Sequence, residues 1–154
     1  MKISLLLTGK TTESYIEEGV NVYQKRLKHY IGFEIIILPE LKQIKVESLI
    51  KEKEAEIQLS KIGEGDYLIL LDKSGKQFSS VGFAQYLQQL MNKSIRQVKF
   101  LVGGAYGFSP VIYQRANDKV ALSEMTFSHQ LVRLVFTEQL YRAFTIINNE
   151  SYHH

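Results

Sequence analysis

Residues 97–110 have the sequence QVKFLVGGAYGFSP, in which an apolar run stops at a glycine-rich turn and a proline follows. The run from Gln97 to Val102 has the length and composition of a buried strand. Pro110 suits the first turn of a helix, because the N–H that proline lacks has no partner within a helix at that position. The segment therefore predicts a strand, a tight turn and a helix, which together form the basic unit of an α/β fold.

The same switch between two kinds of apolar spacing occurs along the whole chain. Short apolar runs predict five strands, at residues 3–7, 33–38, 66–71, 97–102 and 119–122. Apolar side chains at three- and four-residue steps predict five helices, at residues 12–30, 45–62, 79–91, 110–117 and 129–147. Strands that alternate with helices are typical of a mostly parallel sheet covered by helices on both faces. We therefore predict one α/β domain over residues 1–154.

The composition excludes several classes of site. The chain of 154 residues contains no cysteine, so it has no disulfide framework, no thiolate nucleophile and no cysteine zinc site. Its formal charge of +3 is small for a protein that holds nucleic acid by charge alone. The sequence contains neither a signal peptide nor an apolar segment long enough to span a bilayer. We expect a cytoplasmic protein that binds neither membrane nor metal.

Ligands of open parallel sheets bind beyond the carboxyl ends of the strands, which directs attention to three loops, at residues 71–76, 103–110 and 122–129. Glycines at 103, 104 and 107 let a backbone approach a ligand closely, although a tight turn alone also explains them. The spacing is not that of a dinucleotide fingerprint. No Lys-Ser or Lys-Thr pair follows Gly107, so the loop is not a P-loop either.

The segment from Leu122 to His129, LSEMTFSH, mixes hydroxyl groups with large apolar side chains. Such a mixture could line the site of a flat, partly apolar ligand. The alternative is a connection anchored in the core, in which Ser128 caps the last helix. Both interpretations stay open on the sequence.

The last helix is apolar on more than one side, which is typical of a central helix or of one covered by a second subunit. In a domain of this size the pattern favours a homodimer. Glu138 and Arg142 are four residues apart and form either a surface ion pair or part of a site at the dimer seam. The chain ends in Tyr152, His153 and His154, which are either a frayed terminus or site residues.

Three features together resemble one family along the whole chain. They are the glycine loop, the block LSEMTFSHQLVRLVFTEQLYRAF at residues 122–144 and the ending YHH at 152–154. The chain resembles the ribosomal RNA large subunit methyltransferase H family of the SPOUT superfamily. The resemblance implies an α/β fold with a C-terminal trefoil knot, an obligate homodimer and S-adenosylmethionine (S-adenosyl-L-methionine) as cofactor. It also implies methylation of N3 of a pseudouridine in helix 69 of 23S rRNA within the assembled 70S ribosome.

The resemblance also assigns roles by position. It implies cofactor contacts at Leu71, Gly103, Gly104, Leu122, Ser123, Glu124, Met125, Thr126, Phe127 and Ser128. It implies substrate contacts at Arg133 and His154, and a catalytic group of His129, Arg142, Tyr152 and His153. Within that group, we expect one histidine or the tyrosine to remove the imide proton and Arg142 to stabilise the anion that forms.

The sequence departs from the family pattern at a few positions. Ala105-Tyr106 stands where some relatives have Pro-Glu, and Ser128 and Ser151 stand where proline is common. The competing interpretation is a non-catalytic dimeric module that binds a nucleotide or RNA. A hydrolase using Ser109 or Ser123 is disfavoured, because the sequence lacks the G-x-S-x-G pattern around either serine.

Overall fold

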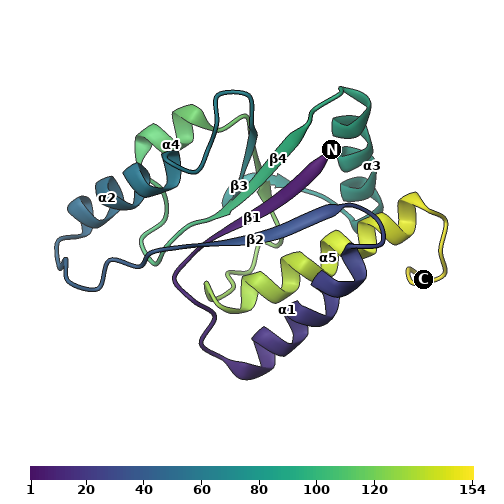
Figure 1. Cartoon of the computed structure of the whole chain (residues 1–154), viewed down its shortest axis with the longest axis horizontal. Helices are drawn as coiled ribbons and strands as arrows, with labels where there is room; N and C mark the ends of the chain where they lie inside the picture. The colour runs from purple at the N-terminus through teal and green to yellow at the C-terminus, as the bar shows by residue number, and fades with distance from the viewer.

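The computed structural model describes residues 1–154 and consists of five strands and five helices that alternate along the chain (Figure 1). The strands are β1 (Lys2–Thr8), β2 (Gly32–Leu38), β3 (Tyr67–Gln77), β4 (Gln97–Val102) and β5 (Asp118–Ala121). The helices are α1 (Ser14–Leu27), α2 (Glu47–Leu59), α3 (Ser80–Asn92), α4 (Pro110–Arg115) and α5 (Leu131–Ile147). The predicted alternation is confirmed, and the element ends shift by only a few residues except at the end of β3.

All five strands form one parallel sheet in the order β2-β1-β4-β3-β5. The apolar residues of β1 from Leu5 to Leu7 are fully or almost fully buried, as expected for a strand covered on both faces. Because the strands are parallel, all their carboxyl ends lie at the same edge of the sheet. The loops that follow β1, β3, β4 and β5 therefore converge there.

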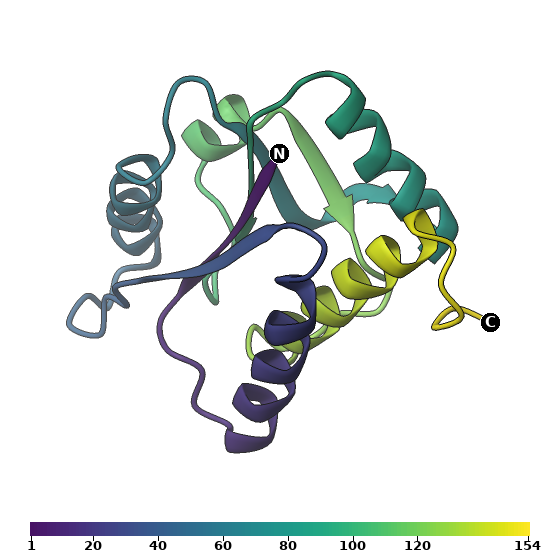
Figure 2. The ribbon, with the colours of Figure 1, turned by 45° about the vertical axis from the view of Figure 1, so that its right-hand side comes forward.

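Helices cover both faces of the sheet, with α1, α3 and α5 on one side and α2 and α4 on the other (Figures 1 and 2). On the first side, the rings of Phe100 and Phe136 lie 4.7 Å apart in the larger core. On the second side, Ala55 and Ile112 pack with Leu101. The predicted α/β fold with helices on both faces is confirmed.

Strand β3 is longer than the sequence indicates. Residues 72–76 look like a polar turn, yet the strand continues through them to Gln77. After a bulge, Lys76 and Gln77 pair with Val120 and Ala121 of β5. Pairing with a distant strand thus extends β3 beyond this polar segment, and local composition carries no sign of that partner.

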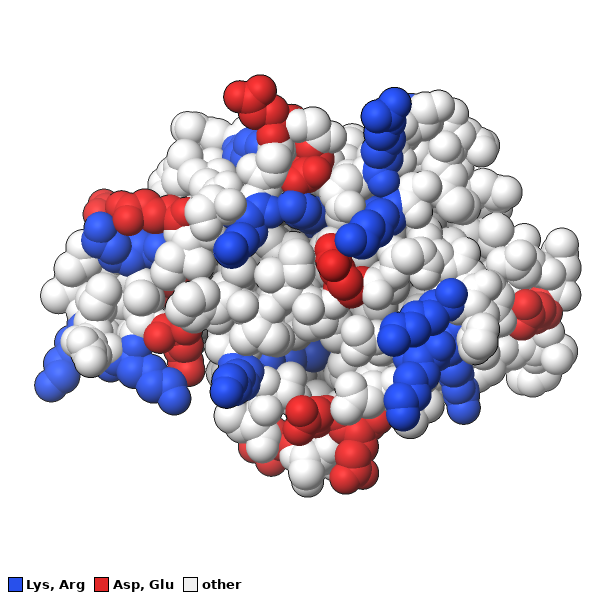
Figure 3. Space-filling model, in the orientation of Figure 1, with Lys and Arg blue, Asp and Glu red and all other residues white.

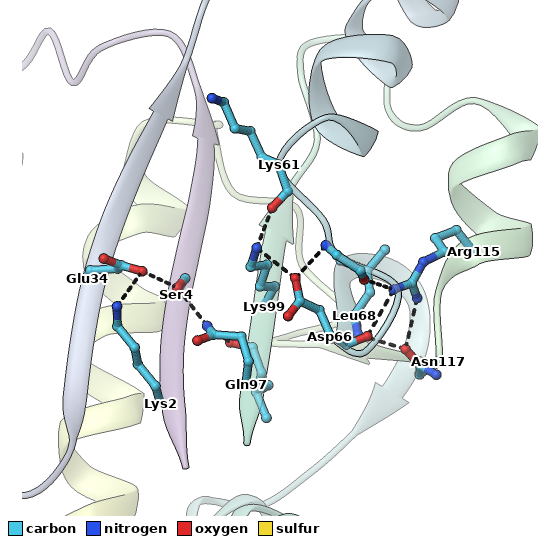
Figure 4. A network of polar contacts seen from close by, with 12 residues as sticks. Lys2, Ser4, Glu34, Lys61, Asp66, Leu68, Gln97, Lys99, Arg115 and Asn117 are labelled. Atoms are coloured by element: carbon cyan, nitrogen blue, oxygen red, sulfur yellow. Dashed lines mark hydrogen bonds and ion pairs between the residues drawn. The ribbon is translucent and has the colours of Figure 1, made fainter. Parts of the chain in front are cut away.

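The amino ends of the strands are held by a network of polar contacts (Figure 4). Lys99 and Asp66 form an ion pair of 2.7 Å, and both side chains are largely buried. Arg115 donates hydrogen bonds to the carbonyl oxygens of Gly63 and Asp66, at 2.7 and 3.0 Å. The side chain of Asn117 accepts a hydrogen bond of 2.8 Å from the backbone of Leu68. The network lies at the end of the sheet opposite the ligand-binding loops, so its role is to hold strands together.

Lys and Arg side chains on the face seen in Figure 3 form separate groups with Asp and Glu between them. This view contains no continuous basic stripe. None of the five helices combines the length and the apolar character that crossing a bilayer requires.

A candidate active site at the carboxyl edge of the sheet

The main cavity has a volume of about 800 Å³ and lies beyond the carboxyl ends of β4 and β5, beside the middle of β3. Its walls come from the segments that follow Leu71 and Val102 and from residues 120–129. More than half of the lining residues are hydrophobic, 12 of 22, and the rest are glycines and polar or charged residues. The size and the composition are those of a pocket for a small organic ligand.

The glycine loop after β4 is closed by its own backbone. Gly107 has a φ of +76°, a conformation that favours glycine, and its N–H donates a hydrogen bond of 3.1 Å to the carbonyl oxygen of Gly104. A Cβ atom on Gly104 would lie 2.6 Å from a carboxylate oxygen of Glu54. The absence of a side chain at Gly104 therefore lets α2 approach the loop closely.

Residues 122–129 both line the cavity and start the last helix. The Ser123 hydroxyl accepts a hydrogen bond of 2.9 Å from the Met125 backbone, which shapes the turn. The Ser128 hydroxyl accepts one of 3.1 Å from the Leu131 backbone, at the first turn of α5. The two interpretations of this segment are thus compatible, because Ser128 caps the helix and also contacts the cavity.

The structure brings together nearly all of the predicted cofactor residues, since each of them except Glu124 lines the main cavity. They are Leu71, Gly103, Gly104, Leu122, Ser123, Met125, Thr126, Phe127 and Ser128. His129 of the predicted catalytic group lines it as well.

Sequence reasoning missed other residues of the cavity, among them Lys51, Asp72 and Tyr113. Burial raises the pKa of Asp72, but hydrogen bonds from Ser74 and from the Tyr113 hydroxyl outweigh that effect and lower it. Asp72 follows Leu71 in one of the three loops chosen for attention, so its place could have been inferred. Lys51 lies on α2, and nothing in the local sequence indicates that this helix approaches the glycine loop.

Arg133 lies in the interior, where its side chain is 1% exposed. Its guanidinium donates hydrogen bonds to the carbonyl oxygens of Thr8, Gly9 and His129, at 2.9, 3.0 and 3.0 Å. It therefore ties the end of β1 to the start of α5. Burial lowers the pKa of Arg133, although the charge of Glu40 opposes the change. Arg133 therefore supports the position of His129, and its side chain is inaccessible to solvent.

The other predicted catalytic residues form a second cluster near the C-terminal end of α5. Arg142 and Glu138 form an ion pair of 2.6 Å, and the Tyr152 hydroxyl lies 3.1 Å from the same carboxylate oxygen. The guanidinium carbon of Arg142 lies 4.8 Å from the centre of the Tyr152 ring. Burial, and then hydrogen bonds with Tyr23 and Glu138, raise the pKa of Tyr152. Nδ1 of His153 is buried and has no hydrogen-bond partner, whereas His154 at the chain end is exposed.

A single chain does not bring the two groups together. His129 precedes α5, and Arg142 lies eleven residues beyond Leu131, the first residue of that helix, which corresponds to about 17 Å at 1.5 Å per residue. The structure contains no group of three or more His, Asp or Glu side chains placed to hold a metal ion.

The sequence of this chain matches a known protein family over nearly its whole length. Residues 1–153 match the family described as "Predicted SPOUT methyltransferase". The chain belongs to the SPOUT methyltransferase family. Within this family, a Flavobacterium johnsoniae protein named ribosomal RNA large subunit methyltransferase H is 53% identical over 156 residues. Proteins of the same name from Christiangramia forsetii and Parabacteroides distasonis are 51% and 50% identical. Each of these alignments covers 100% of this chain and 99% of the relative, and the resemblance found in the sequence is confirmed.

Proposed function

We propose that this chain is a single SPOUT domain that transfers a methyl group from S-adenosylmethionine to N3 of a pseudouridine in helix 69 of 23S rRNA, within the assembled 70S ribosome in the cytoplasm. The observation that carries the proposal is the convergence of three loops on one cavity of about 800 Å³. The name that the relatives share, ribosomal RNA large subunit methyltransferase H, supports rRNA as the substrate class.

The residues of the cavity fit the proposed cofactor. An adenosine group needs a flat apolar slot with polar atoms at its edges, and Leu71, Leu122 and the bare backbone of Gly103 supply these features. S-adenosylmethionine supplies an activated methyl group, so the reaction needs neither a metal nor a protein nucleophile. The enzyme has to hold the target nitrogen in line with that methyl group.

The target nitrogen must lose a proton, and His129, Tyr152 and His153 were the expected acceptors. The raised pKa of Tyr152 keeps its phenol protonated, which makes the tyrosine a hydrogen-bond donor. We therefore assign proton removal to one of the two histidines. Arg142 is held by Glu138 and stays charged, as electrostatic stabilisation of an anionic base requires. In the same proposal, His154 contacts the RNA, and Arg133 acts on the substrate by holding His129.

The proposal includes a homodimer with a C-terminal trefoil knot. The position of Arg142, about 17 Å along α5 from its first residue, supports a dimer, because a second copy can bring its own Arg142, Tyr152 and His153 to the first cavity. Leu131 at the start of α5 is 36% exposed, which leaves apolar surface for a partner. Membership of the SPOUT methyltransferase family supports the knot.

The small formal charge of +3 and the dispersed charges on the face seen in Figure 3 support a whole ribosome as the partner, because shape then replaces a long basic groove. We expect methylation of 70S particles and little methylation of naked 23S rRNA. Equal rates on both substrates would contradict this part of the proposal.

The decisive experiment measures tritium transfer from labelled S-adenosylmethionine to 70S ribosomes from a strain that lacks this enzyme. Mass spectrometry then identifies the labelled nucleotide, and the expected product is N3-methylpseudouridine in helix 69. Absence of label with cofactor binding intact would favour a non-catalytic RNA-binding module. Single-turnover rates of His153→Ala and Arg142→Ala test the roles of these side chains, and an unchanged rate removes that residue from the mechanism.

A further inference from the structure

A second cavity of about 250 Å³ lies beside the main one. It is lined by Thr8 at the end of β1, Glu40 after β2, Glu54 of α2 and the turn after β4. The order of the strands places this cavity where the chain changes direction across the sheet, between β1 and β4. Open parallel sheets bind ligands at such a switch point. Gly104 and His129 line both cavities, so the two spaces meet at these residues.

The second cavity is lined by carboxylates that have no cationic partner. Glu54 is 8% exposed and makes no hydrogen bond or ion pair. Both of its carboxylate oxygens lie against Gly104, at 2.6 and 2.8 Å from where a Cβ atom would stand. The buried hydroxyl of Thr8 also has no hydrogen-bond partner. Glu40 adds a second carboxylate, and no Lys or Arg lines the space.

The buried Thr8 hydroxyl has no hydrogen-bond partner, and Glu54 is a largely buried residue without one, so a ligand that donates hydrogen bonds to both would offset the cost of their burial. The group that fits two carboxylates and a hydroxyl is a primary ammonium, which has three N–H donors and a positive charge. Burial, followed by the charge of Glu40, raises the pKa of Glu54, and a bound cation would offset both effects. Glu40 and Glu54 are not part of a group of three or more His, Asp or Glu side chains, which is the kind of group that most often holds a metal ion.

We propose that the second cavity binds the α-ammonium group of the methyl donor, with the carboxylate of Glu54 as its main acceptor and Thr8 and Glu40 as further acceptors. The inference rests on the proposed function, since it assumes that S-adenosylmethionine occupies the main cavity. The donor then spans both cavities: its adenosine lies in the larger one and its amino group passes Gly104 and His129 into the smaller one. Glu54 thereby orients the reactive end of the donor without touching the methyl group.

The test compares two ligands of the full-length chain by calorimetry: S-adenosylhomocysteine and its analogue without the α-amino group. The wild-type protein should bind S-adenosylhomocysteine at least about tenfold more tightly, as expected for a hydrogen bond to a charged group. Glu54→Gln keeps the shape of the side chain and should remove most of this difference, with the affinity for the analogue unchanged. Glu52→Gln, on the exposed side of the same helix, is the matched control and should change neither affinity.

Each alternative result has a distinct meaning. Equal affinities of the wild-type protein for the two ligands would overturn the inference and leave the proposed function intact. An equal loss for both ligands in Glu54→Gln would also overturn it, because the residue would then only support the glycine loop. If neither ligand binds the wild-type protein, the proposed function itself fails. Should Glu54→Gln not fold, Thr8→Val removes only a hydroxyl and should selectively weaken S-adenosylhomocysteine.

Discussion

The close approach of β3 to β5 at Gly75 leads to a quantitative prediction for Gly75→Ala. A Cβ atom at this position would lie 2.5 Å from the backbone nitrogen of Val120 and 2.6 Å from the carbonyl carbon of Lys119. Ordinary contacts begin at about 3.4 Å, so the two strands must separate by about 1 Å. The atoms in the way belong to the backbone, which cannot rotate aside as a side chain can.

The cost follows from the strand pairs beyond this close approach. A separation of about 1 Å lengthens the hydrogen bonds of the pairs Lys76–Val120 and Gln77–Ala121 beyond useful range. Their loss adds to an overpacking strain of about 1–3 kcal/mol, so we expect the free energy of unfolding to fall by about 3 kcal/mol. At a urea slope of about 2 kcal/mol/M, the midpoint falls by about 1.5 M. Affinity for S-adenosylhomocysteine should also fall, because Val120 and Ala121 line the main cavity.

The assay is urea unfolding at one fixed protein concentration, since association with a second copy affects stability. Gly65→Ala is the matched control, because a Cβ atom there has no neighbour within 4 Å. We expect its free energy of unfolding to stay within about 0.5 kcal/mol of that of the wild-type protein. If Gly75→Ala unfolds at the same midpoint as Gly65→Ala, the close approach of β3 to β5 is refuted.

Further predictions concern the sheet network, the buried arginine and the tail. Asp66→Ala should lower the free energy of unfolding by about 3 kcal/mol at neutral pH, because it leaves Lys99 largely buried without its partner. Burial raises the pKa of Asp66, but hydrogen bonds from Lys99 and the backbone outweigh it, so the folded pKa lies below 3.8. The contribution of Asp66 to the free energy of unfolding is therefore fully present above pH 3.8 and is lost as the pH falls through the folded pKa. If the stability of Asp66→Ala fell with acid as much as that of the wild-type protein, this assignment would be contradicted. Arg133→Met should lower the free energy of unfolding, measured in urea, by about 3 kcal/mol or more, because buried carbonyl oxygens lose their hydrogen-bond donor. Unchanged stability would contradict this structural role and leave Arg133 available to contact the substrate. His153→Ala should slow single-turnover methylation while its affinity for S-adenosylhomocysteine stays within about twofold, and lost cofactor affinity would instead indicate a structural role.

The local pattern was sufficient for the element order and for most of the main cavity. Apolar runs and helical spacing are properties of short segments, and the parallel sheet follows from their alternation. The three loops that contain Leu71, Gly104 and the segment from Ser123 to Ser128 were found because loops after parallel strands meet at one edge, and the family resemblance then implied cofactor contacts at these residues. Glu124 was included with its neighbours and lies outside the cavity lining, since consecutive residues of a turn point in different directions.

Contacts between distant segments could not be predicted from the sequence. The polar stretch at residues 72–76 is a strand only because β5 supplies its partner, and Arg133 is buried only because the end of β1 supplies carbonyl oxygens. The second cavity has the same origin: Thr8, Glu40, Glu54 and Gly104 come from four separate segments. By itself the sequence determined the elements, their alternation and the edge where a ligand binds, because these depend on neighbours along the chain. Only the tertiary structure decided which buried groups lack partners, because pairing and burial depend on segments that meet through folding.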